Sequence, residues 1–139
     1  MHLLKLVLTA VLLGLSGCAS VAGSNQSNEL ERLQYAWSAA IRWSDFQGAI
    51  NLIEPEQRAA QPLTAVELER YRQVQVAAYR DVGASSNFAQ GTAVRDIEMS
   101  VINRHTQAER GVRYREQWRW DPAAKTWWLV SGLPDLDAR

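Results

Sequence analysis

The carboxylate of Glu116 would be suited to acid–base chemistry if it were buried without a partner. In "VRYREQWRW", residues 112–120, apolar side chains alternate with basic and polar ones, and Glu116 falls on the apolar face. An unpartnered buried carboxylate is costly, so such a group either pairs with a cation or serves as a general acid or base. A structural interpretation of Glu116 stays open beside the catalytic one: it pairs with an arginine such as Arg42, or it lies near an open rim. Paired or solvated carboxylates are the commoner arrangement.

The opposite face of the same strand carries three arginines, Arg113, Arg115 and Arg119. If residues 122–125 form the next turn, Arg119 lies opposite Trp128, and Trp128 then shares the arginine face. Arginine and tryptophan are favoured anchors at protein interfaces. We therefore predict that Arg113, Arg115, Arg119 and Trp128 bind a partner.

Two adjacent tryptophans in the last strand must point to opposite faces of the sheet. The predicted turn places Trp120 opposite Trp127, but a slip of one residue exchanges Trp127 with Trp128, so the sequence does not decide which is buried. One fills the core and the other lies on the outer face. An alternative to partner binding stays open, because the arginines or residues 133–139 would also shield a single outer tryptophan.

The only cysteine, Cys18, follows a short apolar N-terminal run. Residues 6–15 are too few to span a bilayer, which takes about 20, but they match the hydrophobic region of a signal peptide. "LSGC", residues 15–18, resembles the lipobox of bacterial lipoproteins. The resemblance implies a signal peptide over residues 1–17, cleavage before Cys18 and acylation of that cysteine. Because Ala19 is not an aspartate, it also implies the outer membrane, whereas the alternative is a secreted protein with a free cysteine.

The residues after Cys18 change in character near Asn28. Residues 18–28 are predicted to form the lipidated cysteine and a flexible tether, since 19–28 are small and polar without apolar periodicity. Two or more acyl chains make such an anchor durable, at about 0.8 kcal/mol per buried CH₂. Residues 29–139 are predicted to be a single domain.

The composition excludes several classes of function. Fifteen basic residues balance 15 acidic ones, which argues against nucleic acid as a partner. A single cysteine allows no disulfide, and His105 has no second histidine or cysteine near it to support a zinc site. No phosphate-binding glycine loop or nucleophile motif appears. The sequence therefore predicts neither a metal nor a cofactor.

Three helices are predicted to precede the strands. The first covers residues 29–43, and the second is capped by Ser44 and ended by Pro55, with 54–62 as a connection. The third begins at a Thr64–Glu67 capping box, and its apolar stripe runs to Gly83, where it ends; the stripe consists of Leu68, Tyr71, Val74, Ala78 and Tyr79.

From residue 84 onward the period changes to two. A weak strand or loop surrounds Phe88, and clear strands follow at 94–104, 112–121 and 126–132. This order predicts an α+β fold, in which three helices pack on one face of a curved antiparallel sheet.

The helices, the "DFxxA" of residues 45–49 and the closing hairpin with its tryptophans resemble the nuclear transport factor 2-like superfamily. That resemblance covers roughly residues 29–133 and implies a cone-shaped domain like that of ketosteroid isomerase. An isomerase-like member places an acid or base and a tyrosine inside the cone. The residues here that would fill this role are Glu116, Tyr114, Tyr35, Tyr71, Tyr79 and Asp45.

These features together predict a non-enzymatic outer-membrane lipoprotein that faces the periplasm. Its sheet face would act as a binding or assembly module for a second copy of the chain or an envelope protein. The alternative is a pocket function inside the cone: binding of a small hydrophobic ligand, or isomerase-like acid–base catalysis, with Tyr35, Tyr71, Tyr114 and Glu116 as the lining residues.

Overall fold

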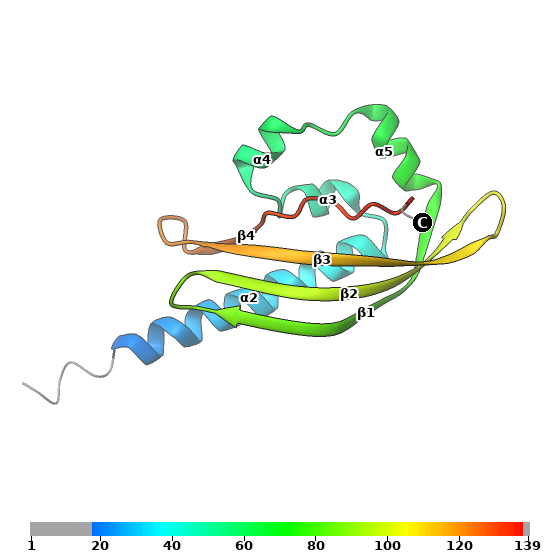
Figure 1. The fold of residues 1–139 in the computed structure, drawn as a ribbon. Coiled ribbons are helices and arrows are strands. Elements are labelled where there is room, and N and C mark those ends of the chain that lie inside the picture. The colour runs from blue at the N-terminus through cyan, green and yellow to red at the C-terminus, as the bar shows by residue number, and fades with distance from the viewer. Residues whose placement is uncertain (1–17, 138–139) are drawn as a thin grey trace, which may run out of the picture.

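The computed structural model describes residues 18–137, which form an α+β fold (Figure 1). The predicted signal peptide, residues 1–17, lies outside the described residues. No helix in residues 18–137 is long and apolar enough to cross a membrane. In chain order the elements are α2 (Cys18–Arg42), α3 (Phe46–Ile50), α4 (Pro55–Ala60), α5 (Ala65–Arg72), β1 (Val74–Asn87), β2 (Thr92–Asn103), β3 (Glu109–Asp121) and β4 (Thr126–Leu129).

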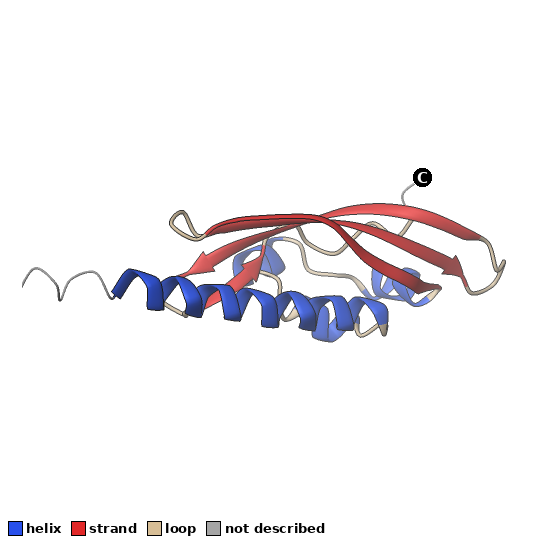
Figure 2. Cartoon of the chain, turned by 90° about the horizontal axis from the view of Figure 1, so that it is seen from below, coloured by secondary structure: helices blue, strands red, loops and turns tan. Residues whose placement is uncertain are grey.

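The four strands form one open antiparallel sheet in the order β1-β2-β3-β4. Figure 2 shows the helices on one side of this sheet and no helix on the other. The α+β class and the antiparallel sheet are therefore confirmed. Four helices rather than three lie within the described part of the chain.

The core lies between α2 and the inner face of the sheet. Leu30, Leu33, Trp37 and Ile41 recur every three or four residues on α2 and are buried. From the sheet, Val112, Trp118, Trp127, Leu129, Ile97 and Met99 are buried against them. Large aromatic side chains supply much of this buried apolar surface.

The predicted tether is helical in the structure. α2 begins at Cys18 rather than near Glu29, so residues 18–28 extend the predicted helix by about three turns. The main-chain carbonyl of Gln26 accepts a hydrogen bond of 2.9 Å from Trp127 Nε1, and Glu29 accepts one of 3.1 Å from Thr126 Oγ1. These contacts with β4 stabilise turns of α2 whose sequence has no apolar stripe.

The second helix is shorter than predicted and has a different cap. Asp45, not Ser44, is the N-cap of α3, because its carboxylate accepts a 2.9 Å hydrogen bond from the Gly48 main-chain N–H. Ser44 instead adopts a positive φ of 59°. Pro55 does not end this helix but occupies the first turn of α4, where a missing N–H costs nothing. The predicted connection after it is thus partly helical.

The third helix begins as predicted and ends early. The Thr64–Glu67 capping box is present, but α5 stops at Arg72, and Val74–Asn87 is the edge strand β1. Val74 and Val76 alternate inward as in a strand. Two register shifts, at Val76/Ala78 and Asp81/Gly83, then break the alternation. The two bulges hid the strand period, and the remaining apolar residues happen to match a helical stripe.

The closing hairpin has the predicted register. Trp120 pairs with Trp127, and Arg119 pairs with Trp128. Trp127 is fully buried, whereas Trp128 is half-buried on the outer face. This register shows that Trp127 is the buried tryptophan and Trp128 the outer one, a choice that the sequence alone left open.

Candidate functional site

Glu116 lies at the centre of a buried ion pair. Its side chain is 0% exposed, and Arg95, at 9%, is directly opposite it in the β2–β3 register. Arg95 Nε lies 3.0 Å from Oε2, and Arg95 Nη2 lies 2.7 Å from Oε1. This two-pronged geometry is the strongest form of the arginine–carboxylate contact. The partner is therefore Arg95, whereas Arg42, the arginine that we had named, is exposed at the end of α2.

Two further donors complete the coordination of the carboxylate. The Tyr79 hydroxyl donates to Oε1, and the Trp118 indole donates to Oε2 over 2.9 Å. Glu116 thus accepts four hydrogen bonds from three side chains, two on each oxygen. A buried charge with its polar atoms satisfied in this way is a stable structural element.

The same cluster connects the sheet to the long helix. Arg95 Nη2 also donates to the Gln34 carbonyl at 3.1 Å and to Ser38 Oγ at 2.8 Å. α2, β1, β2 and β3 therefore meet at one guanidinium group. The sequence contained a signal for this role that we missed, since Arg95 lies in phase with the inward residues Ile97 and Met99.

The surroundings of Tyr79 and Arg95 hold each of these two side chains in one protonation state. Burial, the charge of Glu116 and the hydrogen bond to it raise the pKa of Tyr79 far above its ordinary value. Burial alone would lower the pKa of Arg95, but the hydrogen bonds and charge of Glu116 outweigh it and raise that pKa. Around neutral pH, Tyr79 is therefore a neutral donor and Arg95 a cation.

The tyrosines of the predicted pocket do not converge on Glu116. Tyr35 is 77% exposed on α2. The Tyr114 hydroxyl donates to the Gly132 carbonyl at 2.7 Å, and that of Tyr71 donates to the Pro134 carbonyl at 3.0 Å. Burial raises the pKa of both, that of Tyr71 to about 12. Asp45 is occupied as the cap of α3. The set therefore does not form one acid–base site.

The predicted arginine face is the uncovered outer face of the sheet. Arg115 binds Asp96 through contacts of 2.7 and 3.2 Å, and Arg119 Nε lies 2.7 Å from the Glu54 carboxylate. Arg113 is different, because its side chain is 89% exposed and its nearest acidic atom, on Glu98, is 3.8 Å away. Of these three arginines, Arg113 is the one most available to a partner.

Trp128 is held in place on this face. Its indole Nε1 donates to Asp121 over 3.2 Å, and the ring is only half-exposed. This geometry fits a tryptophan shielded by its own neighbours better than an exposed anchor. The centre of the candidate surface therefore lies away from β4, over the first three strands.

A hollow of about 710 Å³ lies on the sheet near Arg113. Ala78, Ser100 and Gly111 are aligned across β1, β2 and β3, and their small side chains leave space there. The next row along the strands is Arg80, Glu98 and Arg113. We call this hollow and its charged row the sheet hollow.

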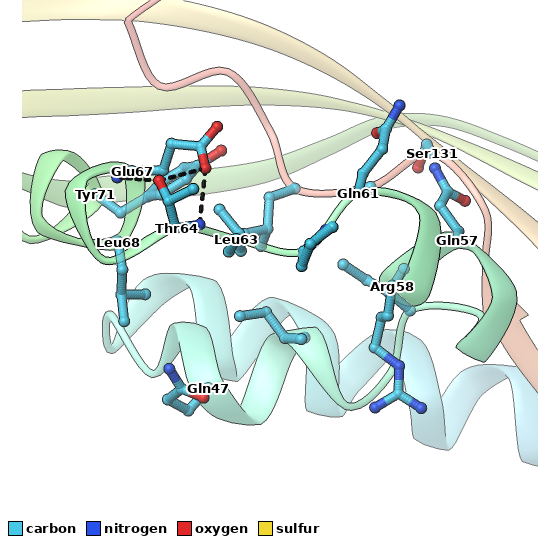
Figure 3. Close-up of a pocket in the computed structure, with 15 residues that line it drawn as sticks. Gln47, Gln57, Arg58, Gln61, Leu63, Thr64, Glu67, Leu68, Tyr71 and Ser131 are labelled. Atoms are coloured by element: carbon cyan, nitrogen blue, oxygen red, sulfur yellow. Dashed lines mark hydrogen bonds between the residues drawn. The ribbon is translucent and has the colours of Figure 1, made fainter.

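A second concavity, of about 690 Å³, lies on the helical side, away from the sheet hollow. It runs between α3, α4, α5 and residues 131–133, and Figure 3 shows its lining. We call it the helical groove. Of the predicted pocket residues, Tyr71 alone lines it.

The described residues contain no cluster of three histidine, cysteine or acidic side chains arranged for a metal ion. His105 lies exposed in the turn between β2 and β3.

The solved structures that resemble this fold include two SEC-C motif containing proteins. The solution structure from Rhodopseudomonas palustris has a TM-score of 0.55 and 18% identity, over 69% of this chain and 70% of that one. The crystal structure from Psychrobacter arcticus has a TM-score of 0.59 and 10% identity, over 82% of this chain and 65% of that one. At these identities the likeness concerns the fold alone. Neither a family model nor a curated protein matches the chain.

These neighbours correct the expected superfamily. The prediction of a nuclear transport factor 2-like cone was wrong, because the similar structures are SEC-C motif containing proteins. Helices followed by an antiparallel meander are common to several α+β folds, so element order could not separate them. The neighbours also lend no support to the lipoprotein resemblance, which rests on the apolar run and the "LSGC" of residues 6–18 alone.

Proposed function

We propose that this protein is a non-enzymatic binding or assembly module that recognises a protein partner through the outer face of its sheet. The observation that carries the proposal is the sheet hollow, which lies on the face that no described helix covers. An uncovered hollow bordered by charged side chains offers shape and charge to a partner, both of which specific recognition needs.

Arg113 is the residue of this face that we propose contacts the partner directly. Its guanidinium is almost fully exposed and lies 3.8 Å from Glu98, which also binds Arg80. Because Glu98 is shared, a carboxylate from a partner can reach Arg113 without breaking a close pair. The partner is a second copy of this chain or an envelope protein with an acidic group at this position.

The proposed place of action is the periplasmic side of the outer membrane, with the chain anchored through acylated Cys18. The support is the "LSGC" sequence and the apolar run before it. The engagement of Glu116 by four donors supports the non-enzymatic interpretation, since no lone pair of that carboxylate is directed at an accessible space.

Crosslinking in intact cells tests the proposed surface. A photo-crosslinking residue at Gly111, in the sheet hollow beside Arg113, should capture a defined partner or a second copy, and the same residue at Arg32 should not. Arg32 is a matched control because it is exposed and paired on α2, away from the sheet face. Arg113→Glu should then reduce capture from position 111 at least tenfold. Equal adducts from positions 111 and 32 would refute the sheet-face proposal.

A Cys18→Ala variant tests the location separately. In membrane fractionation, the variant should appear in the soluble fraction, whereas the unsubstituted protein should appear in the membrane pellet. If the variant is processed normally and still remains in the membrane fraction, the lipid anchor is wrong, while the sheet-face result stands on its own.

A further inference from the structure

The helical groove is apolar along its middle and polar at its ends. Ile50, Ile53, Leu63, Leu68 and Leu133 contribute apolar surface, and its volume of about 690 Å³ is typical of small-molecule sites. Its walls come from three helices and the C-terminal segment, so it is independent of the sheet face. A groove of this kind suits a ligand with an apolar body and a polar head.

Arg58 supplies a cation without a counterion at one end of the groove. Its Nε is enclosed by protein and has no hydrogen-bond partner, and no ion pair involving Arg58 occurs among residues 18–137. Arg42, Arg70 and Arg104 also form no ion pair within residues 18–137, but each of them is exposed, whereas Arg58 is half-buried. Because Nε is closed off by protein, a ligand anion would bind at the two terminal Nη atoms, which form no ion pair with an acidic group among the described residues.

The other end of the groove carries the opposite charge. Glu67 lies there with Thr64, across the groove from Arg58 in Figure 3. Its carboxylate is already used, since it accepts hydrogen bonds of 2.8 and 2.7 Å from the Thr64 main-chain N–H and hydroxyl. These bonds lower the pKa of Glu67, so that end stays anionic. The charges at the two ends therefore orient a bound ligand, with its anionic head at Arg58 and its apolar tail toward Leu63 and Leu68.

We propose that the helical groove binds an amphipathic carboxylate, such as a medium-chain fatty acid. One unpaired arginine matches one negative charge, and its planar fork fits a carboxylate through two parallel hydrogen bonds. The apolar residues between the ends remove the alkyl chain from water.

Calorimetric titration of the folded protein with decanoate tests this proposal. Decanoate should bind saturably, and decylammonium, which has the same chain length and the opposite charge, should bind at least tenfold more weakly. Arg58→Gln should weaken decanoate binding at least tenfold. Arg72→Gln is the matched control, because it removes a paired arginine from neighbouring α5 and should leave the affinity unchanged. No binding of decanoate, or equal binding by the Arg58→Gln protein, would overturn the proposal.

A second substitution keeps the test decisive if Arg58→Gln fails to fold. Leu63→Asp places a negative charge in the path proposed for the alkyl chain and should abolish decanoate binding, with circular dichroism verifying the fold. Unchanged binding by Leu63→Asp would place decanoate outside the groove and refute the site. Arg113→Glu should retain full decanoate affinity, so this result is independent of the sheet-face proposal.

Discussion

Arg95 and Glu116 face each other across β2 and β3, and both oxygens of the carboxylate are held by nitrogens of the one guanidinium, at 3.0 and 2.7 Å. The pair is enclosed beneath α2, whose Gln34 carbonyl and Ser38 hydroxyl accept the remaining bonds from Arg95. The inward charge that first suggested catalysis thus connects a helix to three strands.

Glu116→Gln should strongly destabilise the protein, because it leaves the buried Arg95 with only the half-exposed Asp81, 3.9 Å away, as a counterion. Removing one partner of a buried ion pair typically costs about 3–5 kcal/mol. Urea unfolding followed by tryptophan fluorescence measures the change in the free energy of unfolding. The double variant Arg95→Met with Glu116→Leu should be far less destabilised. A loss below about 1 kcal/mol in Glu116→Gln would contradict a structural role for the pair.

Stability should fall at alkaline pH because of the buried tyrosines. In the unfolded chain tyrosine ionises near pH 10, whereas burial raises the pKa of Tyr71 to about 12 and that of Tyr79 further. Since only the unfolded state loses these protons, the stabilisation is complete below about pH 10 and is lost as pH rises above it. Urea midpoints measured between pH 8 and 11 report this slope. A Tyr71→Phe, Tyr79→Phe protein should show a shallower slope, and an unchanged slope would refute the assignment.

The first turns of α2 should depend on Trp127. Trp127→Phe keeps most of the ring but removes the indole hydrogen bond to the Gln26 carbonyl. Hydrogen exchange of the amides in residues 22–29 should accelerate, whereas the amides around Ile41 should remain protected. Equal protection in both proteins would show that this helical segment is stable without β4.

The capping box of α5 offers a smaller and more local test. Thr64→Ala removes the side-chain acceptor for the Glu67 N–H and should cost about 1 kcal/mol. Val66→Ala is the matched control, because Val66 is exposed on the same helix and alanine is a good helix former. Chemical denaturation of both variants measures the difference. Equal stability of the two would mean that α5 does not need its cap.

The sequence correctly predicted those parts of the fold that depend only on residues close together in the chain. The alternation through β3, the turn before β4 and the Thr64–Glu67 cap each follow from neighbouring residues, and the structure has all three. β1 was missed because two bulges interrupt its alternation, so that Tyr79 fell into a helical stripe. The turns of α2 near Gln26 were missed because contacts with β4, distant in sequence, hold them.

Of the candidate sites, only single residues such as Glu116 could be predicted from the sequence, and the contacts that those residues make could not. Glu116 was recognised as unusual from its strand phase alone, but its partner depends on the β2–β3 register, which a single strand does not reveal. The inward-facing position two residues before Ile97 in β2 is Arg95, so continuing the alternation of this strand would have identified it. The helical groove carries no sequence signature, because its walls meet only when α3, α4, α5 and residues 131–133 are folded together.

The unbroken run of α2 from Cys18 to Arg42 affects how an acylated chain would meet its surroundings. A 25-residue helix is about 37 Å long and has no break between Cys18 and the residues that pack on the sheet. In an acylated chain, this rigid helix would take the place of a flexible linker between the bilayer and the domain. The tilt of the helix would then set the distance from the bilayer and the direction at which the arginine-bearing face is presented.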